Sequence, residues 1–147
     1  MTERRKSSYD IVRIVWQLGN ILVKNRNKKL NALKLTSVQT EIIAFLLRNT
    51  NKEEINQLDI QEYLLLSNPA VTGILKRMEE KGLIERTRSC KDSRNKNIKL
   101  TKKGLELKEV LKANMAEEET RIIKGMTSEE RMEFVRLLHI ALKNIDY

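Results

Sequence analysis

The spacing of the apolar residues changes at Gly82, and this change restricts the fold more than any other feature of the sequence. Before it, "SNPAVTGILKRMEEKG" places Val71, Ile74, Leu75 and Met78 at helical spacing, with Gly82 as the stop. After it, "LIERTR" and "KNIKLT" alternate apolar and polar residues around a polar turn, the pattern of an antiparallel hairpin. The chain must therefore place a helix directly before a hairpin.

Three further helices are predicted ahead of the helix that ends at Gly82. Apolar residues at helical spacing predict an amphipathic helix from about 8 to 25, followed by a polar, basic connection, "KNRNKKLNALK". "LTSVQTEIIAFLLRN" predicts a second helix, in which Thr36 and Gln39 have the spacing of a capping box. "INQLDIQEYLLL" predicts a short third helix. At the start of the helix already noted, Ser67 or Asn68 can be the cap.

Three helices followed by a hairpin form the winged helix-turn-helix arrangement. We therefore predict a mainly α-helical fold with a small β-hairpin wing, built as a single domain over residues 1–147. After the hairpin, a long helix is expected from Thr101 through Met115, and a last one after a second capping box at Thr127 and Glu130. Helices at about 8–34 and 105–147 lie outside the DNA-binding module of about 36–104. Their surplus apolar residues predict a homodimer.

The positive charge is concentrated in two segments. The chain has 29 Lys and Arg against 20 Asp and Glu, a net charge of +9 that favours polyanionic partners. Residues 1–34 carry nine basic and two acidic side chains, and residues 82–104 carry eight basic and two acidic ones. An evenly basic surface would not show this distribution.

The helix from Ser67 to Lys81 and the hairpin have the chemistry to bind DNA. The second helix of a helix-turn-helix lies in the major groove with its N-terminal residues at base edges. Its first turns offer small and polar groups, and Lys76 and Arg77 can reach phosphates or guanine. The wing supplies Arg86, Arg88, Lys91, Arg94, Lys96 and Lys99 for phosphates or the minor groove. The alternatives are an ordinary amphipathic surface helix and a merely solvated charged loop.

Asp92, the one acid in the wing turn, cannot bind a phosphate. We expect its carboxylate to fix the turn by accepting hydrogen bonds from nearby N–H groups and by pairing with Arg86 or Arg94. Asp92 and Arg86 are therefore the predicted wing-bracing residues.

These residues together resemble the core of the MarR family of bacterial transcription regulators. The resemblance consists of a Val-Thr pair in the recognition helix, Glu-x-x-Gly-Leu-Ile-x-Arg after it, an Asp-x-Arg wing turn and Leu-Thr-x-x-Gly. In this sequence they are Val71 and Thr72; Glu79, Gly82, Leu83, Ile84 and Arg86; Asp92 and Arg94; and Leu100, Thr101 and Gly104. The flanking helices agree in number and order. Where the family often has Arg between the two wing residues, this chain has Ser93.

The resemblance implies a homodimer that binds a pseudo-palindromic operator on double-stranded DNA, most often as a repressor. It implies that Arg94 enters the minor groove and Asp92 braces the wing. It also implies that Ser67, Asn68, Thr72, Lys76 and Arg77 face the operator. A small aromatic or phenolic effector, held near Tyr9, Trp16 and Phe45, is a further expectation; the alternative is that these are core or interface aromatics. A nonspecific architectural DNA-binding protein and a helical protein-interaction adaptor are the rival functions.

Other classes of function find little support in the sequence. We expect no catalytic residues, no metal site and no cofactor, because the chain has a single His, a single Cys and no Gly-rich phosphate loop. His139 is interpreted as a core-edge or interface side chain. Cys90 lies among cations that favour a thiolate, but a stray exposed cysteine is the simpler reading. With no signal peptide in "MTERRKSSYD" and no long apolar run, we expect a cytoplasmic protein without a membrane span.

Overall fold

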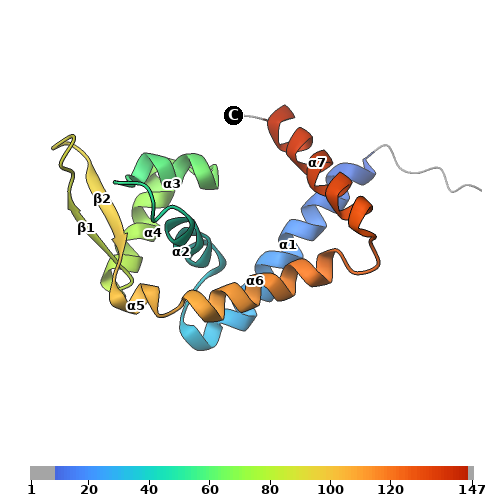
Figure 1. Cartoon of the computed structure of the whole chain (residues 1–147), viewed down its shortest axis with the longest axis horizontal. Helices are drawn as coiled ribbons and strands as arrows, with labels where there is room; N and C mark the ends of the chain where they lie inside the picture. The colour runs from blue at the N-terminus through green and yellow to red at the C-terminus, as the bar shows by residue number, and fades with distance from the viewer. Residues whose placement is uncertain (1–8, 146–147) are drawn as a thin grey trace, which may run out of the picture. The chain divides into compact units, whose positions relative to one another are not determined.

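The computed structural model describes residues 9–145, which form helices and one two-stranded hairpin (Figure 1). The elements in chain order are α1 (Asp10–Leu30), the 3₁₀ turn η1 (Asn31–Leu33), α2 (Ser37–Arg48), α3 (Gln57–Leu64), α4 (Asn68–Glu80), β1 (Ile84–Arg88), β2 (Lys96–Leu100), α5 (Lys102–Leu105), α6 (Lys108–Ile122) and α7 (Ser128–Asn144). The predicted fold class is thus confirmed. Predictions for residues 1–8 and 146–147 lie outside the described residues. The chain divides into two compact units, Met1–Ile42 and Ile43–Tyr147.

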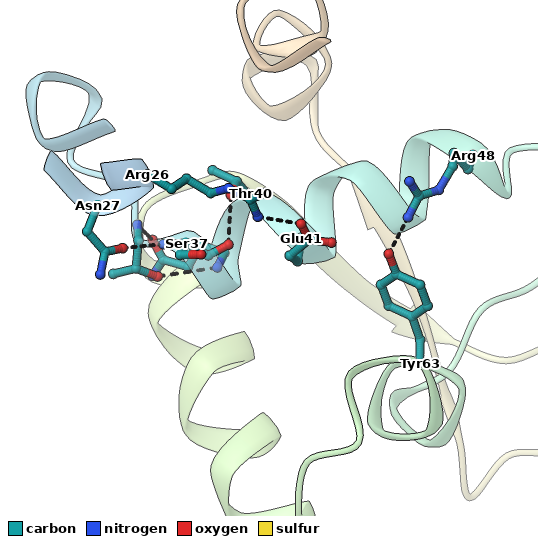
Figure 2. Close-up of polar contacts among 9 residues, drawn as sticks. Arg26, Asn27, Ser37, Thr40, Glu41, Arg48 and Tyr63 are labelled. Carbon is teal, nitrogen blue, oxygen red and sulfur yellow. Dashed lines mark hydrogen bonds and ion pairs between the residues drawn. The ribbon is translucent and has the colours of Figure 1, made fainter. Parts of the chain in front are cut away.

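In the first unit, α1 is longer than the sequence predicted. It continues to Leu30, which is only 1% exposed, so the prediction that the helix ends near residue 25 was wrong. Lys and Arg are good helix formers, and the basic stretch continues the helix instead of interrupting it. Figure 2 shows why its last turns are ordered. Asn27 accepts a hydrogen bond from the backbone N–H of Ser37 at 2.6 Å, and Arg26 pairs with Glu41.

Both predicted capping boxes are present. The backbone N–H of Gln39 donates to Thr36 Oγ1, and the backbone N–H of Thr36 donates to Gln39 Oε1, each at 3.2 Å. Thr127 and Glu130 make the same reciprocal pair at the start of α7. The hydrogen bonds to Glu130, of which the one from the backbone of Thr127 is the strongest, lower the pKa of its carboxyl group. Local side-chain chemistry therefore fixes where these two helices begin.

The second unit has a core formed by the end of α2, by α3 and α4, and by the hairpin (Figure 1). Its buried apolar side chains are Ile43, Ala44, Phe45, Leu46, Ile55, Ile60, Val71, Leu75, Met78, Leu83, Ile84, Ile98 and Leu111. β1 and β2 pair antiparallel with Ile84 opposite Leu100. The predicted stop at Gly82 is confirmed by its left-handed φ of 73°, a conformation that glycine adopts without a steric penalty.

The long helix predicted after the hairpin is divided in two. Thr101 caps α5, as expected, but that helix ends after Leu105 and α6 begins only at Lys108. At the break, the backbone N–H of Leu107 bonds to the carbonyl of Gly104, three residues back, so the chain makes a tight turn. The prediction of one continuous helix from Thr101 through Met115 was wrong.

Helices α1 and α7 carry many exposed apolar side chains. On α1, Ile11 is 80% and Trp16 is 67% exposed; on α7, Leu142 is 58% exposed. Among the described residues no single helix is long and apolar enough to cross a membrane. The bent pair Asp10–Leu33 and Ser37–Arg48 passes that test only together and on length and composition alone, as core helices of water-soluble proteins also do.

Candidate nucleic-acid interface

Helices α3 and α4 are joined by a tight turn that orients α4. Leu65 ends α3 in the left-handed region with φ of 55°, and the backbone N–H of Leu66 bonds to the carbonyl of Gln61 at 3.2 Å. Ser67 then caps α4, its Oγ accepting from the backbone N–H of Ala70 at 3.4 Å. Of the two candidate caps, the structure therefore has Ser67.

Polar residues predicted to face the operator meet at the start of α4, together with one that was missed. Asn68 and Thr72 are exposed, and the Thr72 hydroxyl donates to Asn68 Oδ1 at 3.0 Å. Gln57, the first residue of α3, donates from Nε2 to both, at 2.7 Å to Thr72 Oγ1 and 3.0 Å to Asn68 Oδ1. Sequence reasoning missed Gln57 because its partners lie 11 and 15 residues away. Further along α4, Lys76 and Arg77 are exposed.

The hairpin register places like charges opposite each other near the wing turn. Arg88, the last residue of β1, pairs with Lys96, the first of β2. Both are exposed, and within residues 9–145 neither has an ion pair. Directly opposed like charges destabilise a strand pair. Farther from the turn, Glu85 lies opposite Lys99, an attractive pairing. Positive charge without an ion-pair partner among residues 9–145 is thus concentrated next to the turn.

Asp92 organises the wing turn. Its Oδ1 accepts from the backbone N–H of Arg94 at 3.0 Å and from Arg94 Nε at 3.3 Å. Its Oδ2 accepts from Asn95 Nδ2 at 3.4 Å. Arg94 is still 90% exposed, so its guanidinium remains accessible at the tip. Of the two partners considered for Asp92, the structure has Arg94.

Arg86 instead joins the wing to the recognition helix. Its Nε lies 2.7 Å from Glu79 Oε2, near the end of α4. The hydrogen bond from Arg86 lowers the pKa of the Glu79 carboxyl group, with a smaller contribution from the charge of Lys96. The expected pairing of Arg86 with Asp92 was therefore wrong, because the register puts Arg86 opposite Ile98, away from the turn. Its guanidinium is engaged with a carboxylate and half-buried.

A carboxylate from the loop between α2 and α3 holds the base of the wing turn. Glu54 Oε1 accepts from the backbone N–H of Cys90 at 2.8 Å, and its Oε2 accepts from the Ser89 hydroxyl. Ser89 Oγ in turn accepts from the backbone N–H groups of Lys91 and Asp92, each at 3.1 Å. The two hydrogen bonds that Glu54 accepts lower the pKa of its carboxyl group, and the one from Ser89 has the larger effect. Sequence reasoning missed Glu54, which lies 35 residues from Ser89.

Two further contacts attach this loop to the wing. Lys91 Nζ lies 2.8 Å from Glu53 Oε2, and hydrogen bonding to Glu53 raises the pKa of the Lys91 ammonium group. The backbone of Ile55 pairs with β2, accepting from the N–H of Ile98 at 2.7 Å and donating to Asn97 Oδ1 at 3.0 Å. The wing is thus held from its turn to its middle, and Lys91 has a protein partner that a phosphate would have to replace.

The three aromatic residues considered for an effector pocket have different environments. Phe45 is buried and stacks on Tyr63, with ring centroids 4.6 Å apart. The Tyr63 hydroxyl accepts from Arg48, as Figure 2 shows. Tyr9 and Trp16 are 74% and 67% exposed. A separate cavity of about 220 Å³ is lined by Ala44, Leu47, Arg48, Lys108, Leu111 and Lys112.

The remaining chemistry-bearing residues do not gather into a site. Over residues 9–145, no group of three or more His, Cys, Asp or Glu could hold a metal ion. His139 is exposed on α7, and Cys90 is an exposed free thiol. Within the same residues, every buried side-chain nitrogen or oxygen has a hydrogen-bond partner.

Comparisons with known proteins agree with this architecture. The family model for the MarR family matches residues 35–96. The chain is 32% identical over 98 residues to the HTH-type transcriptional regulator SarZ of Staphylococcus haemolyticus, covering 66% of this chain and 65% of SarZ. It is 28% identical over 127 residues to the uncharacterized HTH-type transcriptional regulator YwoH of Bacillus subtilis, covering 86% of this chain and 90% of YwoH.

Solved structures with the same fold span nearly the whole chain. The transcription regulator MarR from Oenococcus oeni superposes with a TM-score of 0.79 at 30% identity, covering 91% of this chain and 99% of that one. A complex of Staphylococcus aureus MepR with DNA superposes with a TM-score of 0.87 at 23% identity, covering 96% and 100%. The family model matches, and the chain is 30% identical to the Oenococcus oeni regulator over 99% of that protein's length, so the chain belongs to the MarR family of transcription regulators.

Proposed function

We propose that the protein is a homodimeric transcription regulator that binds a pseudo-palindromic operator in double-stranded DNA. The observation that carries the proposal is the positive charge on the wing, where Arg88 and Lys96 lie opposite each other without an ion pair among residues 9–145, and where Arg94 is exposed in the turn. Such an arrangement costs stability in the free protein and is relieved by phosphates.

The recognition helix supplies the surface for base readout. Asn68 and Thr72 are exposed in the first turns of α4, where helix-turn-helix proteins contact base edges. Lys76 and Arg77 follow one turn later with free reach to a base or the phosphate backbone. Of the predicted contact residues, Arg86 and Lys91 are paired with Glu79 and Glu53. We therefore propose that the main role of Arg86 and Lys91 is to position the wing, and that contact with phosphate is a lesser role.

The exposed apolar faces of α1 and α7 support dimerisation. Soluble monomers rarely leave so many large apolar side chains exposed on one helix, and a palindromic operator requires two-fold symmetry in the protein. A second copy of the chain is the occupant that satisfies both requirements. Repression and release by a small aromatic effector complete the proposal. The candidate contacts for such a molecule are Trp16 on α1 and Tyr9 directly before it, both exposed.

Competition binding separates this function from its rivals. A sequence-specific regulator prefers a selected palindrome over bulk DNA by about 10³-fold or more. An architectural DNA-binding protein would show little preference, and a protein-interaction adaptor would bind DNA barely at all. Selection from a random duplex library, followed by titration of the enriched sequence against bulk competitor, measures this ratio.

A single substitution tests the observation behind the proposal. Arg88→Gln removes one of two opposed cations, so the free protein should become slightly more stable, by about 0.2–1 kcal/mol. Binding to DNA should weaken, and the slope of log K against log salt should become shallower by about one unit. Lys124→Gln, which removes an exposed cation after α6, is the matched control and should change neither quantity. An Arg88→Gln variant that binds DNA as tightly as the native chain would contradict the proposal.

A further inference from the structure

The hydrogen bonds among Gln57, Asn68 and Thr72 give the Asn68 amide a defined direction. Asn68 Oδ1 accepts from Gln57 Nε2 and from Thr72 Oγ1, both at 3.0 Å. An amide oxygen has two lone pairs, so these two donors saturate it. Thr72 Oγ1 also accepts from Gln57 at 2.7 Å, which closes a three-membered network.

The same network leaves one group of Asn68 available to a ligand. Among residues 9–145, the Nδ2 group of Asn68 has no hydrogen-bond partner, and the residue is exposed at the start of α4. That group is a donor of two N–H bonds and accepts none. The recognition helix therefore presents a donor at this position, while the acceptor is held inside the protein.

We propose that Gln57 is a specificity-determining residue that turns the Asn68 donor toward the DNA and so selects a guanine. Asparagine usually reads adenine by a bidentate contact in which its oxygen accepts from N6 and its nitrogen donates to N7. Here the oxygen is already occupied. A group with two N–H donors fits guanine best, because O6 and N7 are two acceptors on one major-groove edge, whereas adenine N7 and thymine O4 offer one acceptor each. The inference rests on the proposed function and adds the base that Asn68 reads.

Replacing Gln57 by Ala tests the positioning role. The change removes one of the two donors to Asn68 Oδ1 and leaves only Thr72 to orient the amide, while Ala is well tolerated in the first turn of α3. On a panel of operators varied one base pair at a time, the preference for guanine at one position in each half-site should fall about tenfold. Preferences at the other positions should stay as they are. Gln61→Ala removes the same side chain from the same helix, where it makes no hydrogen bond to another described residue, and should leave the whole profile unchanged.

Replacing Gln57 by Glu makes a sharper test because it should reverse the preference. A carboxylate cannot donate, so the Asn68 amide should rotate, give its Nδ2 group to Glu, and turn its oxygen toward the DNA. The selected base should then be one that offers a donor, cytosine N4 or adenine N6. The added negative charge lowers the affinity for every DNA sequence by the same factor. That factor cancels when the affinities for two operators are compared as a ratio. An acidic residue in the first turn also suits the helix dipole, so the fold should be retained.

The outcomes distinguish this inference from the proposed function. If the native chain selects an operator and both Gln57 variants keep its base profile, the inference is wrong and the proposed function stands. If the guanine preference weakens in Gln57→Ala and moves to cytosine or adenine in Gln57→Glu, the inference holds. If the native chain shows no sequence preference at all, both fall together.

Discussion

Gly104 lies so close to Leu83 that a Cβ on the glycine would be 2.4 Å from the Leu83 carbonyl oxygen and 2.9 Å from Leu100 Cδ2. The backbone oxygen cannot move away, because it accepts a hydrogen bond from the N–H of Thr101 at 3.1 Å. Thr101 also donates its hydroxyl to the carbonyl of Gly82 and accepts from the N–H of Gly104. The Leu-Thr-x-x-Gly sequence therefore fastens α5 to the base of the wing.

Gly104→Ala should accordingly destabilise the fold. The clash is with backbone, so we expect the free energy of unfolding to fall by about 1–3 kcal/mol, the usual cost of overpacking. Gly73→Ala is the matched control, since a Cβ there meets nothing closer than the end of Arg77 at 3.9 Å and should stabilise α4 by about 1 kcal/mol. Urea titrations at one fixed protein concentration compare the two, and an unchanged midpoint for Gly104→Ala would contradict the close approach.

The second prediction concerns the pH dependence of stability at Glu54, whose direction follows from the shift in its pKa. The pKa of its carboxyl group is lowered in the folded protein, above all by the hydrogen bond from Ser89 and then by the N–H of Cys90. The stabilisation it gives is present above the ordinary carboxylate pKa and is lost as the pH falls through the lower, folded value. The amide of Cys90 should report this loss directly. Its nitrogen and proton shifts should titrate with a midpoint below that of an ordinary glutamate.

Glu54→Gln is the control for that titration. Its amide oxygen can still accept from Cys90, but nothing at this position ionises, so the acid transition of the Cys90 amide should disappear. Glu53→Gln removes the neighbouring carboxylate, which pairs with Lys91, and should leave the transition in place. A Cys90 amide that titrates equally in all three proteins would exclude Glu54 as its partner.

The sequence predicted the parts of the fold whose causes are local. The capping boxes at Thr36 and Thr127 each join residues three apart, and the hairpin follows from alternation on either side of one turn. The left-handed Gly82 stops α4 within a single turn. For these elements the interacting groups are neighbours in the chain, so spacing alone identifies them.

Contacts between distant segments could not be predicted in this way. Glu54 and Gln57 had no local feature that marked them, because their partners on the wing and on α4 are set by how the helices pack. Arg86 had three carboxylates at similar separations in sequence, Glu79, Glu80 and Asp92, and only the packing of the hairpin against α4 decides among them. The direction of the Asn68 amide depends on Gln57, which lies 11 residues away, so it could not be predicted from the sequence either.

The apolar face of α7 supports a prediction about assembly. Leu142 is 58% exposed, and a charge there should be buried against the partner chain if the protein is an obligate homodimer. Leu142→Glu should therefore dissociate the dimer at micromolar concentration, and with it the binding of a palindromic operator. Lys143→Gln changes the adjacent residue without adding charge to the apolar face and should remain dimeric. Sedimentation equilibrium decides the matter, and a native chain that sediments as a monomer of 17.2 kDa would refute the dimer.

The last prediction separates the two residues of the wing turn. Arg94 is exposed at the tip, and if it enters the minor groove, Arg94→Ala should weaken operator binding by about 1–3 kcal/mol and make the salt slope shallower by about one unit. Asp92→Ala removes a negative charge, which by electrostatics alone would tighten binding to DNA. It also removes the acceptor for the backbone N–H of Arg94, so the turn must be ordered again on binding. We expect the cost of ordering the turn to exceed the electrostatic gain, so the affinity of Asp92→Ala for the operator should fall.

Asp92→Asn distinguishes these opposing effects within one side chain. The amide oxygen keeps an acceptor for the Arg94 N–H, while the negative charge is gone. With the turn still braced and the repulsion removed, this variant should bind the operator at least as tightly as the native chain, although Asp92→Ala binds more weakly. Titrations of all three variants across a salt series, on one operator, give the comparison. If Asp92→Ala binds as tightly as Asp92→Asn, the carboxylate acts on DNA only through its charge and does not brace the wing.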